Sequence, residues 1–152
     1  MTLEKQDRTL VRRLQRDCRR SNQALAEETG MSASACWRRV KALEEQGVLT
    51  GYVALADTKK AGFAVSAIVH VILARHERGH VDTFVGMIRD REEVIDCFAT
   101  TGEADYHLRV VAEDMEGYNA FLDDFLFQIP GVASVRTNIV LKEIKTGVAL
   151  PV

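Results

Sequence analysis

Residues 25–49 read LAEETGMSASACWRRVKALEEQGVL, which is a short helical pattern, a break at Gly30 and a second amphipathic pattern that carries several cations. This order is typical of a helix-turn-helix, whose second helix enters the DNA major groove. At about 100° per residue, one sector of the second helix is apolar and predicts the buried face. Its members are Cys36, Val40, Leu43 and Gly47, with Ala33 beside them.

The rest of this second helix is predicted to meet DNA. The candidate contacts are Ser32, Ser34, Ala35, Trp37, Arg38, Arg39 and Lys41. Ser34, near the amino end, can hydrogen-bond to a phosphate or a base edge. Arg38 can donate two hydrogen bonds to a guanine, and Lys41 can neutralise a phosphate. Trp37 either packs against a sugar or thymine methyl or covers the first helix; the alternative for the cations is a solvated helix face.

Upstream residues complete a predicted three-helix core. Residues 3–17 carry Leu3, Leu10, Val11 and Leu14 at helical spacing, which predicts a leading helix. Ser21 and Ser32 are predicted N-caps of the two following helices. The polar side and exit of the leading helix hold six arginines, some of which we expect to contact the DNA backbone. They are Arg8, Arg12, Arg13, Arg16, Arg19 and Arg20.

Charge is distributed unevenly along the chain, although the net charge of the 152 residues is only −2. Residues 1–60 hold 12 Lys and Arg against 8 Asp and Glu, a net of +4, whereas residues 61–152 hold 8 against 14, a net of −6. The first part suits a polyanion and the second would repel one. Two modules with different partners are therefore expected.

Composition limits the class of protein. Hydrophobic residues make up 47% of the chain, yet no uninterrupted apolar run reaches the roughly 18 residues of a membrane span. The first residues are charged, which does not fit a signal peptide. The three cysteines are odd in number and widely spaced, which predicts neither a disulfide framework nor a Cys-x-x-Cys metal site. We expect a cytoplasmic location.

Beyond Gly47 the pattern changes from helical to extended. We expect a helix-turn-helix domain at 1–50, a linker strand (Tyr52–Leu55) and hinge within 51–62, and a second domain at 63–152. In this second domain the predicted strands are 65–73, 94–100, 106–112 and 132–144, and the predicted helices are 81–88 and 118–129. The order β-α-β-β-α-β is the ferredoxin-like arrangement.

The predicted fold class is therefore α+β. It consists of an N-terminal three-helix winged/helix-turn-helix domain joined to a C-terminal ferredoxin-like βαββαβ domain with an antiparallel sheet. Two helices cover one face of such a sheet, and the apolar strands predict that a partner buries the other face. Dimerisation through the sheets is expected.

In this order and spacing, the chain resembles the Lrp/AsnC family, the feast/famine regulators of bacteria and archaea. The resemblance covers nearly the whole sequence. In the amino-terminal part it is carried by Asp7, Leu10, Leu14, Leu25, Ala26, Gly30, Ser32, Cys36, Arg39, Val40, Leu43, Gly47, Leu49, Gly51 and Tyr52. In the remainder it is carried by Gly102, Asp105, Tyr106, Pro130, Gly131, Val132 and Thr137.

The resemblance implies a transcriptional regulator of double-stranded DNA whose second domain binds an amino acid effector. It also implies homodimers that assemble further, often into octamers, with the effector pocket between subunits. The implied pocket lies around the hairpin Thr101, Gly102, Glu103, Ala104, Asp105 and Tyr106. Physically, turn amides can approach a carboxylate closely, and Asp105 or Glu103 can receive an ammonium group. The alternative is a tight hairpin with two solvated carboxylates.

The choice of effector stays open. Residues 36–39 (Cys-Trp-Arg-Arg) and the tail Ile144–Pro151 are similar to a subgroup associated with cysteine-responsive control, which makes L-cysteine the first expectation. Ala104 stands where many of that subgroup have a bulky aromatic, so a branched-chain or other apolar amino acid is the second. Ala33 and Ala35 stand where relatives commonly have prolines, which predicts a less rigid helix entry.

One motif indicates a different class of protein. Residues 76–80 read His-Glu-Arg-Gly-His and match the His-Glu-x-x-His signature of zinc proteases, which needs both imidazoles on one helical face. Here the five residues directly follow a predicted strand and include a helix-weakening Gly, so a solvated loop is the expectation. A metal-dependent hydrolase and an amino-acid-binding metabolic protein are the alternatives. No motif supports catalysis, and no cofactor or metal is expected.

Overall fold

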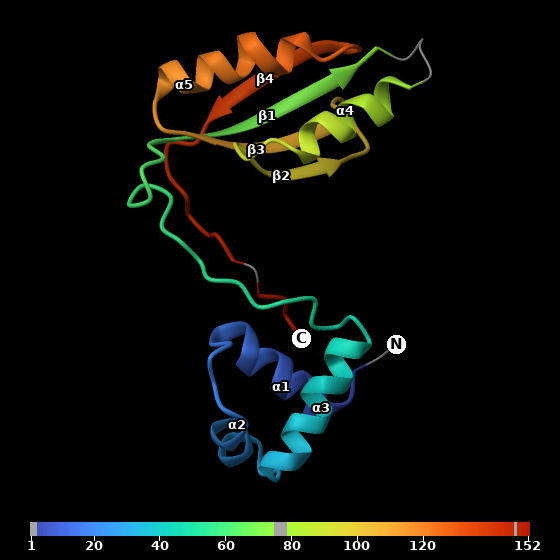
Figure 1. Cartoon of the computed structure of the whole chain (residues 1–152), viewed down its shortest axis with the longest axis vertical. Coiled ribbons are helices and arrows are strands. Elements are labelled where there is room, and N and C mark those ends of the chain that lie inside the picture. The colour runs from blue at the N-terminus through green and yellow to red at the C-terminus, as the bar shows by residue number, and fades with distance from the viewer. Residues whose placement is uncertain (1–2, 75–78, 148) are drawn as a thin grey trace. The chain divides into compact units, whose positions relative to one another are not determined.

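The computed structural model describes residues 3–74, 79–147 and 149–152. The chain divides into two compact units, each described here by itself (Figure 1). The helical unit comprises Met1–Leu55 and Ile144–Val152, and the sheet unit comprises Ala56–Glu143. The expected boundary placed 144–152 with the second domain. In the structure this tail packs with the helical unit, because its last residues hydrogen-bond to the first helix.

The helical unit contains α1 (Lys5–Arg16), α2 (Asn22–Thr29) and α3 (Ala33–Glu45). Both predicted N-caps are confirmed: Ser21 accepts from the Ala24 amide at 3.2 Å and Ser32 from the Ala35 amide at 3.2 Å. Such caps satisfy amides that have no partner inside the helix. The core that these helices enclose consists of Leu10, Val11, Leu14, Leu25, Cys36 and Leu43.

Two residues of the predicted buried face of α3 are exposed. Ala33 lies at the first position of the helix and Gly47 beyond its last residue, so neither is enclosed by the turns that hold Cys36 and Leu43 in the core. Gly47 instead adopts a left-handed conformation, with φ of 69°, at the end of the helix. Helical periodicity alone predicts a buried face that is about one turn longer at each end than the face that α3 buries, Cys36 to Leu43.

The expected linker strand Tyr52–Leu55 is not a strand. Its residues pair with no neighbouring strand in the part of the chain that the structure describes, and a β-ladder requires such a partner. The segment remains exposed, with Val53 at 69% and Leu55 at 77% of their accessible surface. The predicted wing is likewise not seen among the described residues of the helical unit.

The sheet unit has the ferredoxin-like order predicted from the sequence. Strand β1 (Val65–Leu73) is followed by α4 (His80–Arg89), β2 (Val94–Ala99), β3 (Tyr106–Ala112), α5 (Met115–Ala120) and β4 (Val132–Ile139). Between α5 and β4 lie a π-helical segment, Phe121–Phe125, and a short 3₁₀ turn, Leu126–Gln128. The strands align antiparallel in the order β2-β3-β1-β4.

Alternation along β1 explains why this sheet has one covered face. Val65, Ala67, Val69, Val71 and Leu73 are buried, and they pack with the helices through Phe84, Ile88, Tyr118 and Phe121. The side chains between them point to the other face because the period of a strand is two residues. The apolar run of β1 was therefore read correctly as a strand with one face in the core.

Two predicted boundaries in the sheet unit were wrong. The second helical region starts at Met115 rather than 118, because Asp114 caps it by accepting from the Gly117 amide at 2.8 Å. Strand β4 ends at Ile139 rather than 144. The amide of Val140 makes a last bond to the Ser66 carbonyl at 2.8 Å, and the chain then leaves the sheet.

The uncovered face of the sheet is less apolar than the sequence suggested. Ile68 and Phe98 lie on it, but so do His70 and His107, whose rings meet edge to face with centroids 4.7 Å apart. An ion pair between Arg109 and Asp96, 2.9 Å long, occupies the same face. Polar residues alternate with apolar ones here because β1 itself interrupts its apolar run with Ser66 and His70.

Among the described residues, no helix is long and apolar enough to cross a membrane.

Candidate DNA interface and effector pocket

Helix α3 presents a polar side that is open to a partner. Ser34, Arg38 and Lys41 are all exposed, and Arg38 forms neither a hydrogen bond nor an ion pair with any residue the structure describes. Ser34 lies in the first turn of the helix, beside the capping hydroxyl of Ser32 at 3.1 Å. The positive end of a helix dipole together with a free guanidinium favours an anionic ligand.

Trp37 lies on the flank of this side and is 52% exposed. The Lys41 ammonium stands over its ring, 5.3 Å from the centroid, and 3.9 Å from the Glu45 carboxylate. Trp37 lines a cavity of about 460 Å³ together with Leu14, Leu25 and Tyr52. Trp37 thus covers part of the junction between the helices and still leaves half of its surface free for a partner.

Arg39 is held differently from Arg38. Its guanidinium donates to Asp7 at 2.8 Å and to Glu4 at 3.1 Å, both at the start of α1. The hydrogen bonds to Asp7 and then to Glu4 raise the pKa of Arg39 above its ordinary value. The structure therefore gives Arg39 a role in joining α3 to α1, and part of its hydrogen-bonding capacity is already used within the unit.

The six arginines of α1 and its exit separate into engaged and available groups. Arg13 and Arg20 both form ion pairs with Glu28 of α2. Arg8 donates a hydrogen bond to the Leu3 carbonyl, and Arg12 donates to the Val152 carbonyl. Arg19 stands 3.8 Å from Asp17 and is otherwise exposed, and Arg16 has no partner among the described residues.

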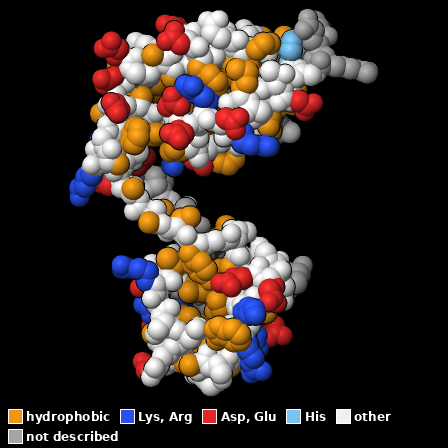
Figure 2. Space-filling view, viewed as in Figure 1, with side chains coloured by type: hydrophobic (Ala, Val, Ile, Leu, Met, Phe, Trp, Pro, Cys, Tyr) orange, Lys and Arg blue, Asp and Glu red, His pale blue; other side chains and the backbone are white. Residues whose placement is uncertain are grey.

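Figure 2 shows basic side chains along the edges of the helical unit and acidic ones spread over the sheet unit.

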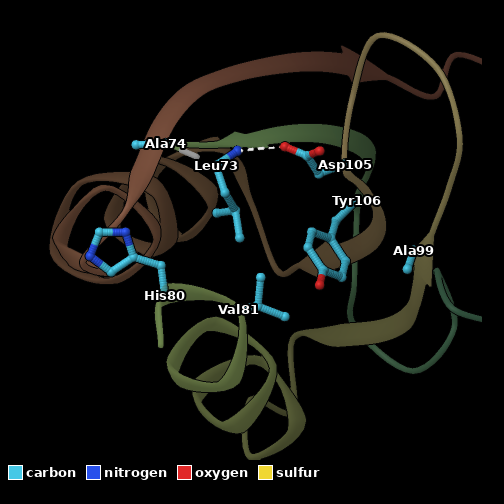
Figure 3. Close-up of a pocket in the computed structure, with 7 residues that line it drawn as sticks. All are labelled: Leu73, Ala74, His80, Val81, Ala99, Asp105 and Tyr106. Carbon is cyan, nitrogen blue, oxygen red and sulfur yellow. Dashed lines mark hydrogen bonds between the residues drawn. The ribbon is translucent and has the colours of Figure 1, made fainter. Parts of the chain in front are cut away.

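The sheet unit holds a cavity of about 250 Å³ where three of its strands meet α4 (Figure 3). Leu73 and Ala74 come from the end of β1, Ala99 from the end of β2, Asp105 and Tyr106 from the start of β3, and His80 and Val81 from α4. Tyr106 also packs against Phe84, with ring centroids 4.7 Å apart. Most of the wall is therefore apolar, with one carboxylate at its edge.

Three hydrogen bonds fix Asp105 at this edge. Its amide donates to the Val71 carbonyl at 3.0 Å, its carbonyl accepts from the Thr100 amide at 3.0 Å, and Oδ2 accepts from the Leu73 amide at 2.8 Å. The last bond is drawn in Figure 3. The second carboxylate oxygen, Oδ1, has no hydrogen bond to a described residue. Asp105 can thus keep its structural bond and accept a cationic group from a ligand at once.

The amino end of α4 faces the same cavity through His80 and Val81 (Figure 3). Its N-cap, Gly79, supplies no side-chain oxygen, and the amino end of a helix favours an anion because of the helix dipole. A carboxylate acceptor and a helix amino end beside an apolar wall match the three parts of an amino acid: ammonium, carboxylate and side chain.

The predicted hairpin residues do not all lie at this cavity. Asp105 and Tyr106 line it, whereas Ala104 is buried, with 5% exposure, and is not among the lining residues. Thr101, Gly102 and Glu103 are exposed, and Glu103 pairs with Arg136 of β4 at 2.9 Å. The lining residues on β1, β2 and α4 were missed. The ferredoxin-like order could have indicated them, since it brings the end of β1 next to the start of β3.

The zinc-protease motif is only partly covered by the structure. His76, Glu77 and Arg78 lie outside the described residues. Gly79 has φ of 106°, a left-handed conformation, and His80 is the first residue of α4. A regular helix therefore does not pass through Gly79 into His80, whereas the motif needs one continuous helix to align its imidazoles. No group of three His, Cys, Asp or Glu side chains suited to a metal occurs among the described residues.

Comparison with known proteins decides the family. Residues 3–44 match the AsnC-type helix-turn-helix domain, and residues 66–150 match the Lrp/AsnC ligand binding domain. The chain belongs to the Lrp/AsnC family. The resemblance to this family is confirmed, as is the α+β fold class with an N-terminal helix-turn-helix domain and a C-terminal ferredoxin-like domain. This Lrp/AsnC protein is a DNA-binding transcriptional regulator with an amino-acid ligand-binding domain.

Several relatives match over almost their whole length. The DNA-binding transcriptional activator DecR of Escherichia coli K12 is 36% identical over 150 residues, 99% of each chain. The leucine-responsive regulatory protein of the same organism is 33% identical over 143 residues, 94% of this chain and 87% of that one. A transcriptional regulator of Neisseria meningitidis, solved in complex with L-Met, is 35% identical with a TM-score of 0.95, covering 99% of this chain and 97% of that one.

Proposed function

We propose that this regulator binds operator DNA through the exposed side of α3 and that an amino acid with an apolar side chain, bound at Asp105, changes that binding. Arg38 and Lys41 contact the DNA, with Ser34 and Ala35 at the amino end of the helix, Trp37 on its flank and Ser32 and Arg39 as positioning residues. The observation that carries the effector half is the fixed carboxylate of Asp105 at an apolar cavity.

The chemistry of the cavity narrows the choice of effector. Leu73, Val81 and Tyr106 offer an apolar wall, and the described lining residues include no lysine or arginine that would select an acidic side chain. L-Methionine is the first candidate, because a relative with 35% identity was solved with that amino acid. L-Cysteine and the branched-chain amino acids follow. The proposal assigns no catalytic step, cofactor or metal to the chain, and it places the protein in the cytoplasm.

The effector acts through thermodynamic linkage in this proposal. If an amino acid binds one arrangement of the protein better than another, and DNA also distinguishes the two arrangements, each ligand changes the affinity of the other by the same factor. Such coupling is typically about 1–3 kcal/mol, or roughly 5- to 150-fold in affinity. Homodimers would present two α3 helices to a nearly palindromic site.

The test is fluorescence anisotropy of the full chain on DNA from upstream of its own gene, at several salt concentrations. Binding should weaken steeply with salt, because phosphate contacts release counterions. L-Methionine, L-cysteine, L-leucine and L-glutamate are added in turn, the last as the control that the apolar wall disfavours. Salt-sensitive binding shifted by an apolar amino acid supports the proposal. Binding equal to that on random DNA, or a response to L-glutamate alone, contradicts it.

We further propose that the sheet units associate into homodimers and then into an octamer. Support comes from the uncovered sheet face, where Ile68 and Phe98 accompany polar groups. Analytical ultracentrifugation with and without L-methionine measures the assembly directly. A monomer at micromolar concentration would contradict the dimer, and a dimer that never grows would contradict the octamer.

A further inference from the structure

The last residues of the chain are bound to α1. Gln15 makes a two-way pair with the backbone of Leu150: Leu150 N donates to Gln15 Oε1 at 2.6 Å, and Gln15 Nε2 donates to Leu150 O at 3.2 Å. Arg12, one turn earlier on α1, donates through Nε at 3.0 Å and Nη2 at 2.6 Å to the Val152 carbonyl oxygen. Four hydrogen bonds therefore join two neighbouring side chains of α1 to two tail residues, Leu150 and Val152.

The tail is shaped for this contact. The Val152 amide donates back to the Leu150 carbonyl at 2.9 Å, which closes a tight turn around Pro151. Proline fixes φ near −65° and so favours this turn before the tail docks. The side chain of Val152 packs against the core of the helical unit, whereas that of Leu150 is 66% exposed. Recognition thus uses the backbone of Leu150 and the side chain of Val152.

This contact changes how the two units are connected. The sheet unit is inserted into the helical unit, because the chain leaves the latter after Leu55 and rejoins it at Ile144. Both connections start at the same end of neighbouring strands, where Ala67 of β1 pairs with Ile139 of β4. At the opposite end of these two strands lies the proposed effector cavity, with Leu73 in its wall.

Both strands also have bonds at the cavity end. Oδ2 of Asp105 holds the Leu73 amide of β1 at 2.8 Å. Glu103, in the same hairpin, pairs with Arg136 of β4 at 2.9 Å. The Ala74 amide, just after β1, donates to the Gly131 carbonyl, just before β4, at 2.7 Å. A ligand that moves this hairpin therefore acts on β1 and β4 together, and their other ends continue into the linker and the tail.

We propose that the docked tail, Leu150–Val152 on Gln15 and Arg12, is a second tether that carries the state of the effector cavity to α1 and the attached α3. The transmission half of this proposal rests on the proposed function. The docking half does not, because it concerns the helical unit alone. Arg39 completes the route inside that unit, since it links Asp7 of α1 to α3.

The variant that tests the tether is Gln15→Ala. It removes both bonds to Leu150 without changing the charge of the DNA-binding surface, and Ala favours the helix. Gln6→Ala is the matched control on the same helix, because Gln6 is exposed and bonds to no described residue. DNA affinity of each full-length variant is measured with and without L-methionine, and the ratio of the two affinities is compared with the wild-type ratio.

Without L-methionine, we expect Gln15→Ala to bind DNA with an affinity within about twofold of wild type. We expect the ratio of DNA affinities with and without L-methionine, which is usually between about 5 and 150 for such coupling, to fall at least about threefold. Gln6→Ala should keep the wild-type ratio. A Gln15→Ala protein with an unchanged ratio would overturn transmission through the tail. A wild-type protein that binds DNA but responds to no apolar amino acid would overturn the effector proposal, and transmission with it.

Hydrogen–deuterium exchange tests docking independently of any effector. The amide of Leu150 should exchange slowly in the wild type and in Gln6→Ala, because it is hydrogen-bonded, and at least about tenfold faster in Gln15→Ala. Equal and fast exchange of the C-terminal peptide in all three proteins would overturn docking. Protection that survives in Gln15→Ala would show that Gln15 does not hold the tail.

Discussion

The two units of this regulator are stabilised in different ways. The described core of the helical unit is six side chains, and polar contacts reinforce it: Arg39 to Asp7, Arg13 and Arg20 to Glu28, and the tail to α1. The sheet unit has fifteen described core side chains contributed by its strands and helices. A larger core buries more apolar surface, which is the main favourable term in folding.

The difference in core size indicates which unit can expose a DNA-binding surface and which can hold a ligand cavity. A small helical unit with many side chains at its surface can expose Arg38 and Trp37 without breaking its fold. A sheet unit with a large core can keep a cavity at its edge, since neighbouring strands hold Asp105 in place. DNA binding and small-ligand binding are therefore assigned to units with cores of different size, and four predictions probe this contrast.

The largest expected effect is that of Leu10→Ala. Leu10 is fully buried in the smaller core, and removing a buried leucine side chain typically costs about 2–5 kcal/mol. That is a large part of the roughly 5–15 kcal/mol that stabilises an ordinary domain. We expect loss of DNA binding at 37 °C while exchange protection in the sheet unit persists. The matched variant Leu108→Ala, equally buried in the larger core, should retain more DNA binding than Leu10→Ala.

Urea unfolding, followed separately in peptides of each unit by hydrogen exchange, gives the measurement. A single transition shared by both units in the wild type and both variants would contradict the separation, because the units would then unfold as one.

Asp105→Asn is expected to weaken amino acid binding next most strongly. The amide oxygen can still accept from the Leu73 amide, so the hairpin stays in place, but the negative charge that would hold an ammonium group is gone. Hydrogen bonds to charged groups contribute about 1.5–3 kcal/mol, so we expect roughly 10- to 100-fold weaker L-methionine binding by calorimetry. Asp105→Ala, which also removes the bond to Leu73, should abolish the response while DNA is still bound.

Glu103→Gln is the control in the same hairpin. Its carboxylate is exposed and pairs with Arg136, so L-methionine affinity should change by less than a factor of about three, as is usual for an exposed ion pair. Loss of binding in Glu103→Gln with retention in Asp105→Asn would reverse the assignment of the two carboxylates.

Arg38→Ala separates DNA binding from stability. A base-reading arginine contributes about 1–3 kcal/mol, so operator affinity should fall roughly 5- to 150-fold while the unfolding midpoint stays unchanged. Arg39→Ala is expected to lower the unfolding midpoint, because the ion pairs to Asp7 and Glu4 are lost. Anisotropy and thermal unfolding measure the two effects; an Arg38→Ala protein with full operator affinity would exclude this residue from base reading.

The smallest expected effect concerns Tyr52. Partial burial, followed by its hydrogen bond to Glu44 at 2.6 Å, raises the pKa of Tyr52, which is 47% exposed, from 10.0 to about 12. Because the folded value lies above the ordinary one, the contribution of Tyr52 to stability is complete below pH 10 and is lost as the pH rises to about 12. Tyr52→Phe should cost at most about 1 kcal/mol at neutral pH.

Absorbance titration of the phenolates checks this assignment. The Tyr52→Phe protein should lack the step near pH 12, while Tyr106 and Tyr118 of the sheet unit, whose pKa values burial also raises, still titrate above their ordinary value. An unchanged titration curve would contradict the environment described for Tyr52.

Much of the fold was predictable because its signals are local. Strand β1 alternates over nine residues, and the predicted range 65–73 matches the observed Val65–Leu73. Ser21 and Ser32 marked helix starts because their hydroxyls act within three residues. The strand expected at Tyr52–Leu55 failed for the opposite reason, since a strand depends on a partner that its own sequence does not specify.

The candidate sites divide in the same way. Helical periodicity was sufficient to put Arg38 and Lys41 on the exposed side of α3. It could not show that Arg39 is bound to α1 or Arg12 to the tail, since those partners are 32 and 140 residues away. The cavity combines the ends of β1, β2 and β3 with α4, so only Asp105 and Tyr106 of its lining were predicted.

By itself, the sequence determined the two kinds of unit and their order, because hydrophobic periodicity, caps and charge distribution are properties of neighbouring residues; the family followed from the resemblance and the matched domains. Only the tertiary structure decided which charged groups are free, which carboxylate of the hairpin faces the cavity, and that the tail returns to α1. Those outcomes depend on side chains that meet from distant positions, where packing and hydrogen-bond geometry select one partner among many of similar chemistry.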